Sequence, residues 1–131
     1  MASYWDMTQE QREALQVHRD RAGISYDLSA ALEYNPGSGR NEEDIKRVLA
    51  IHEGERDEED WVWLVEFVDG ERGLYIGGCD YTGWDCRSSL TLFPFEGWEA
   101  QVRSEWPTWR STPVDAVVAT LRAGLEAPDA D

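Results

Sequence analysis

Hydrophobic positions at helical spacing occupy the first third of the chain. Thr8 and Gln11 fit a capping box, and the apolar residues that follow share one helical stripe, so we predict a helix over 8–21. A second, shorter group of apolar residues at helical spacing predicts a helix over 25–34. This helix is expected to end before a loop rich in glycine and proline at 35–39. These two helices are expected to pack as a pair.

A third helical stripe precedes the central aromatic segment. Consecutive acidic residues at 42–44 suit the positive end of a helix dipole. The side chains after them recur at i, i+3, i+4 and i+7, which is the spacing of an amphipathic helix: Ile45, Val48, Leu49 and His52. We therefore predict a helix over 42–53.

β-branched and aromatic residues then dominate the chain, and Asp69-Gly70 is the strongest hairpin signal in it. We predict strands over 61–68 and 73–79 joined by this turn, and a third strand over 87–93 that completes an antiparallel meander. A turn with a two-residue loop would pair apolar side chains across the hairpin: Val65 with Leu74, Leu64 with Tyr75 and Trp63 with Ile76.

Both faces of the first predicted strand are largely apolar, whereas a sheet with one face in water should alternate polar and apolar residues. Either helices cover both faces, or one aromatic face is kept for a partner. The several amphipathic helices favour coverage of both faces.

The C-terminal third begins irregularly, with a short helix expected around 98–103. Thr112 and Pro113 are typical of a helix start, and we predict the last helix over 113–124. We expect a single α+β domain over 1–125, in which a three-stranded antiparallel meander packs with N-terminal helices and one C-terminal helix, followed by a disordered acidic tail at 126–131.

Charge excludes several classes of partner. The 131 residues contain 27 acidic and 12 basic side chains, for a net charge of −15, which disfavours direct binding of nucleic acid or of an anionic membrane. The basic residues are scattered along the sequence. The N-terminus has no signal-peptide pattern and no apolar run could span a membrane, so we expect a cytoplasmic protein.

The most distinctive segment surrounds the two cysteines and reads Gly77-Gly78-Cys79-Asp80-Tyr81-Thr82-Gly83-Trp84-Asp85-Cys86. With the Asp69-Gly70 turn, it resembles a group of small bacterial and phage proteins of uncharacterised function. The resemblance covers under a quarter of the chain. It implies a shared meander and a phage or actinobacterial setting, and it implies no activity, cofactor or catalytic residue.

Two chemical alternatives centre on the same cysteines. Cys79 or Cys86 could act as a nucleophile with His18 or His52 as its base, in a small Cys-dependent enzyme or ligand-binding protein. Both histidines, however, lie on predicted apolar stripes, which favours structural roles. Two thiols without nearby histidine do not make a zinc site, and the acidic run at 53–60 lacks the order of a calcium loop, so we predict no metal and no cofactor.

The acidic residues are concentrated between 41 and 71, where twelve acidic and three basic side chains give a local charge of −9. A one-sided acidic surface can occlude the basic surface of another protein, so we predict a non-enzymatic protein-binding module of inhibitor or immunity type; a nucleic-acid mimic is the alternative. The oligomeric state is left open. The predicted contacts are acidic or aromatic: Glu42, Glu43, Asp44, Glu55, Asp57, Glu58, Glu59, Asp60, Asp80, Tyr81, Trp84, Asp85, Trp106 and Trp109.

Overall fold

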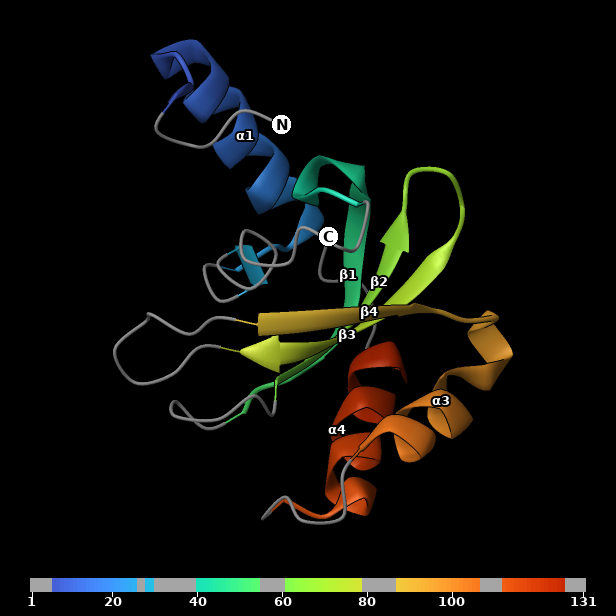
Figure 1. The fold of residues 1–131 in the computed structure, drawn as a ribbon. Helices are drawn as coiled ribbons and strands as arrows, with labels where there is room; N and C mark the ends of the chain where they lie inside the picture. The colour runs from blue at the N-terminus through green and yellow to red at the C-terminus, as the bar shows by residue number, and fades with distance from the viewer. Residues whose placement is uncertain are drawn as a thin grey trace.

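The computed structural model describes residues 6–25, 28–29, 40–54, 61–78, 87–106 and 112–126. These residues form one antiparallel sheet in the order β1-β2-β3-β4, with α1 on one side of it and α3 and α4 on the other (Figure 1). The elements in chain order are α1 (Gln9–Ala22), η3 (Glu42–Asp44), β1 (Ile45–His52), β2 (Trp61–Phe67), β3 (Arg72–Gly78), β4 (Arg87–Leu92), η4 (Phe95–Gly97), α3 (Trp98–Glu105) and α4 (Val114–Glu126).

The α+β class and most of the predicted elements are confirmed. α1 begins with the predicted capping box, in which the Gln11 amide donates to Thr8 Oγ1 at 3.1 Å and the Thr8 amide donates to Gln11 Oε1 at 2.8 Å. α4 continues to Glu126, so the predicted disordered tail begins within this helix. Of the predicted helix over 25–34, only residues 25, 28 and 29 lie among the described residues.

The prediction of a helix over 42–53 is wrong, because this segment forms η3 and the edge strand β1. Ile45 pairs with Phe67, and the register with β2 then shifts twice, once on each side of Val48. At each shift two residues of β1 lie opposite one residue of β2, which is the geometry of a β-bulge. Two bulges convert the two-residue period of a strand into a three-residue period, which imitates the spacing of a helix.

The β2–β3 hairpin also differs from the two-residue loop considered above. The Gly70 amide donates to the Phe67 carbonyl oxygen at 3.0 Å, and the Phe67 amide donates to the Glu71 carbonyl oxygen at 2.8 Å, so the loop has three residues. Gly70 has a φ of 91°, a left-handed conformation that glycine adopts without strain. The register is therefore one residue away from that of a two-residue loop, with three central pairs: Val65–Gly73, Leu64–Leu74 and Trp63–Tyr75.

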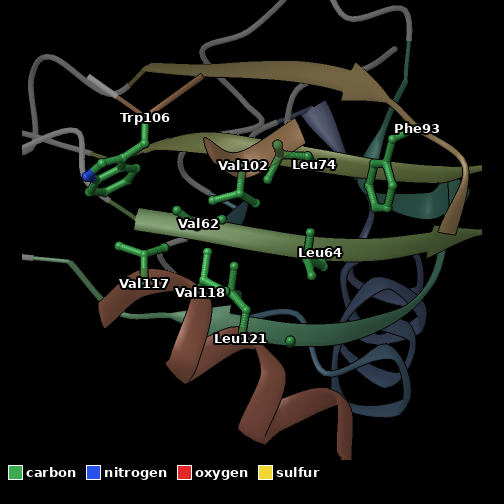
Figure 2. Close-up of a cluster of buried hydrophobic side chains, with 10 residues drawn as sticks. Val62, Leu64, Leu74, Phe93, Val102, Trp106, Val117, Val118 and Leu121 are labelled. Atoms are coloured by element: carbon green, nitrogen blue, oxygen red, sulfur yellow. The ribbon is translucent and has the colours of Figure 1, made fainter. Parts of the chain in front are cut away.

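Buried side chains fill both faces of the sheet, as the apolar pattern of β2 predicted. One face, here called the α4 face, packs against α3 and α4 (Figure 2). Its core consists of Ala50, Val62, Leu64, Leu74, Phe93, Val102, Trp106, Val117, Val118 and Leu121. The opposite face, here called the α1 face, has a core made of Ala22, Ile24, Leu28, Ile45, Trp63, Val65, Phe67 and Tyr75.

Candidate functional site

The strand β1 divides the acidic segment 41–71 between two ends of the sheet. Ile45 pairs with Phe67, so η3 lies beside the β2–β3 turn, whereas Glu53 follows the far end of β1. Eight residues of strand span about 26 Å at roughly 3.3 Å per residue. The segment that sequence reasoning treated as one acidic surface is therefore separated into two, and the part at the β2–β3 turn is the better described.

We call this part the acidic end and define it by Glu43, Asp44, Asp69 and Glu71. A hydrogen bond joins its two halves, because the Val68 amide donates to the Asp44 carbonyl oxygen at 2.8 Å. Within η3, the Asn41 amide donates to Asp44 Oδ2 at 2.8 Å. In the turn, the Glu71 amide donates to Asp69 Oδ1 at 2.9 Å. Backbone hydrogen bonds therefore hold the acidic end in one conformation.

Only part of this negative charge is neutralised within the protein. Arg40 Nη1 donates to Asp69 Oδ2 at 3.0 Å, and its guanidinium lies 4.4 Å from the centre of the Phe67 ring. Glu43 and Glu71 are exposed, and neither forms an ion pair with any of the described residues. Of the four carboxylates of the acidic end, only that of Asp69 forms an ion pair within the described residues. The sequence analysis counted Asp69 and Glu71 in the acidic segment but did not name them as contacts, because only the pairing of β1 with β2 brings them to η3.

Glu42 differs from its neighbours because it is 8% exposed. Its carboxylate accepts hydrogen bonds from Arg19 Nε at 2.5 Å, Arg19 Nη2 at 3.1 Å and Ser29 Oγ at 3.2 Å. The Nε2 atom of His18 lies 2.9 Å from the Glu42 carbonyl oxygen. This residue, which the sequence suggested as a partner contact, instead joins α1 to η3 inside the fold.

The structure also brings Arg72 to two basic residues that are adjacent in the sequence, Lys46 and Arg47. Across β1, β2 and β3, Arg47 lies opposite Glu66, which lies opposite Arg72. The Glu66 carboxylate is 3.2 Å from Arg47 Nε, 3.3 Å from Arg72 Nη2 and 3.9 Å from Lys46 Nζ. The Glu66 side chain is only 12% exposed. Three basic side chains therefore surround the carboxylate of Glu66.

Trp106 is the only predicted aromatic contact among the described residues, and it is 6% exposed. Its indole N–H donates to the Thr112 carbonyl oxygen at 2.9 Å, and its ring meets His52 edge-on. It therefore belongs to the core of the α4 face. The other predicted contacts and both cysteines lie outside the described residues: Glu55, Asp57, Glu58, Glu59, Asp60, Asp80, Tyr81, Trp84, Asp85, Trp109, Cys79 and Cys86.

The two histidines occupy opposite ends of β1. His18 contacts Glu42, just before the strand begins, and His52 is the last residue of the strand. Both side chains are half-buried. The prediction that one of them serves as base to Cys79 or Cys86 stays a prediction, because both cysteines lie outside the described residues.

Two buried donors on the α1 face are a further polar feature. Trp63 and Tyr75 lie opposite each other in the sheet and are both fully buried, and neither Trp63 Nε1 nor Tyr75 Oη has a hydrogen-bond partner among the described residues. Burial raises the pKa of Tyr75 to about 12, and Asp44 adds to the rise, whereas Arg40 opposes it. Tyr75 is therefore a neutral donor at physiological pH.

Within the described parts of the chain, no group of three or more histidine, cysteine or acidic side chains is arranged to hold a metal ion. None of the helices in those parts is long and apolar enough to cross a membrane. Comparisons of the chain with protein-family models, curated proteins and solved structures found no match.

Proposed function

We propose that this protein is a non-enzymatic protein-binding module, which acts in the cytoplasm of a bacterium or phage-infected cell and uses its acidic end to bind a basic surface of another protein. The observation that supports the proposal is the exposure of the Glu43 and Glu71 side chains and the absence of an ion pair to either within the described residues. Both carboxylates are exposed, neither is paired within the described residues, and both are attached to hydrogen-bonded turns.

The mechanism is electrostatic occlusion. A net charge of −15 attracts a basic protein over distances set by the Debye length, about 8 Å at physiological ionic strength. The acidic end then selects the orientation of the partner, because backbone hydrogen bonds hold the carboxylates of Asp44 and Asp69, which therefore lose little conformational freedom on binding. A partner whose basic surface is covered in this way is inhibited, which is the inhibitor or immunity role.

The test is a quantitative pull-down with three baits, read by mass spectrometry at low and high salt. The first bait is the wild-type protein, and the second carries Glu43→Lys with Glu71→Lys in the acidic end. The third is the matched control, Glu53→Lys with Glu126→Lys, which makes the same change of net charge at exposed positions outside the acidic end.

We expect a basic protein to be captured by the wild-type and control baits, released by salt, and lost from the acidic-end variant. Equal loss from both variants would indicate attraction by net charge alone and would contradict the proposal. Loss from the control alone would place the contact at the other end of β1. Circular dichroism of each bait checks that the loss is not due to unfolding.

A further inference from the structure

The two edges of the sheet are protected to very different degrees. β1 contains the two bulges described above, and its first bulge carries Lys46 next to Arg47. Bulges and charged side chains are common devices that prevent an edge strand from pairing with another chain. The β1 edge is therefore unsuited to further pairing.

β4 contains no bulge, and its one charged residue, Arg87, lies at the start of the strand. Its six residues pair with β3 in an unbroken register, from Gly73–Leu92 to Gly78–Arg87. The sequence from 86 to 95 contains no carboxylate, although the chain has 27 of them. Ser89 is exposed, and Leu92 is 45% exposed, which makes it one of three large exposed hydrophobic residues among those described. The β4 strand is therefore regular and contributes no acidic side chain.

The hydrogen bonds between β4 and β3 leave a row of backbone N–H and C=O groups of β4 that point away from β3. The Phe93 amide donates to the Arg72 carbonyl oxygen at 3.1 Å, so Phe93 directs its backbone toward β3. In an antiparallel pair this direction alternates along the strand, so the backbone groups of Leu92 and Leu90 point outward. Within the described residues, no backbone hydrogen bond satisfies these outward groups.

We propose that the outer edge of β4 pairs antiparallel with β4 of a second copy of this chain, so that two four-stranded sheets form one continuous sheet across a two-fold axis. The proposal is independent of the proposed function. An antiparallel strand is always complementary to itself across a two-fold axis, and such isologous dimers are the commonest oligomers. Pairing satisfies the outward backbone groups and covers Leu92 of each copy.

Charge explains why a second copy meets this edge and a basic partner does not. Two molecules that each carry −15 repel, so they approach most easily along a strand that contributes no carboxylate, and β4 contributes none. The carboxylate beside the strand, that of Glu105, is half-buried and accepts a hydrogen bond from Thr91 Oγ1 at 3.0 Å. A basic protein is attracted instead to the acidic end. The two associations must therefore respond oppositely to salt, because screening weakens repulsion between copies and weakens attraction to a basic partner.

Sedimentation velocity on the purified full chain, over a range of concentrations at low and high salt, tests the proposal. We expect a monomer–dimer equilibrium that shifts toward dimer as salt is raised. Leu92→Pro removes one outward N–H, which an edge strand tolerates, and should raise the dimer dissociation constant at least about tenfold. Leu92→Lys should do the same by placing a charge on the edge.

The matched control is Val68→Lys, which replaces an exposed apolar residue of the β2–β3 turn, 64% exposed, with the same cation. It should dimerise like the wild type. A wild-type protein that is monomeric at all concentrations and salts would overturn the proposal, as would Leu92 variants that dimerise normally or a Val68 variant that is equally impaired. Urea denaturation confirms that each variant is folded, and none of these outcomes depends on whether a basic partner exists.

Discussion

The two faces of the sheet are built from alternating residues of the same strands, yet they differ in the type of side chain they bury and in the elements that cover them. The α4 face is mainly aliphatic and is covered by complete helices, which bury Val117, Val118 and Leu121 (Figure 2). The α1 face is aromatic, with Trp61 stacked on Trp63 at 5.8 Å between ring centres. It also encloses polar groups, which the α4 face largely avoids.

Small residues explain the close fit on the α4 face. A Cβ atom added to Gly124 would lie 3.2 Å from Cβ of Ala50, so α4 approaches β1 as closely as these side chains allow. On the α1 side, α1 itself buries only Leu15 and Ala22, and part of the cover comes from the residues that follow it.

The largest expected effect is on the α4 face. Leu121→Ala removes a fully buried side chain from the centre of that core and should lower the free energy of unfolding by about 3 to 4 kcal/mol. Val17→Ala on α1 is the control, because Val17 is 54% exposed and its loss should change stability by less than about 0.5 kcal/mol. Urea denaturation followed by tryptophan fluorescence measures both, and equal effects would contradict the assigned packing.

A smaller loss is expected when the buried polar group of the α1 side is broken. Glu42→Gln removes the carboxylate that pairs with Arg19 and should cost about 2 kcal/mol, reduced from the value for a fully buried pair because the Arg19 side chain is 21% exposed. Asp69→Asn removes the more exposed pair with Arg40 and should cost less than about 1 kcal/mol. Similar losses from both variants would show that Glu42 has no special structural role.

Tyr75 should make stability depend on alkaline pH. The folded protein holds the phenol proton to a pKa of about 12, whereas the unfolded chain releases it near 10. The stabilisation is therefore complete below pH 10 and is lost as the pH rises toward 12, by about 1.4 kcal/mol at pH 11. Tyr75→Phe should remove this part of the pH dependence in urea denaturation between pH 9 and pH 11, and an unchanged pH profile would contradict the burial of the phenol.

The smallest effect tests the close approach of α4. At an open helical position, replacing glycine by alanine stabilises a helix by about 1 kcal/mol. At Gly124 the added methyl group meets Ala50, so we expect a net loss of less than about 1 kcal/mol. Ala119→Gly, at an exposed position of α4, measures the difference in helix propensity between alanine and glycine without any change in packing. It should lower the free energy of unfolding by about 1 kcal/mol. A clear gain in thermal stability for Gly124→Ala would show that the helix does not pack so closely.

Local patterns were sufficient for much of the fold. α1 was predictable because Thr8 and Gln11 satisfy the first free amides of the helix, and α4 because its valines and leucines repeat on one stripe. The strands β2, β3 and β4 were predictable from β-branched and aromatic residues on either side of the Asp69-Gly70 turn. Trp106 was predicted as a partner contact but is buried, because sequence does not show which side of a loop faces the core.

The edge strand and the site depended on tertiary structure. In β1, the spacing of Ile45, Val48 and Ile51 is helical in sequence, and only pairing with β2 makes it a strand with two bulges. That pairing brings Glu43 to the β2–β3 turn, buries Glu42 against Arg19 and collects three cations around Glu66. The sequence by itself determined the start of α1, the apolar stripe of α4, the three strands β2 to β4 and the net charge of the protein. The pairing of distant strands decided where that charge lies, because hydrogen bonds across a sheet join residues whose separation along the chain no local pattern encodes.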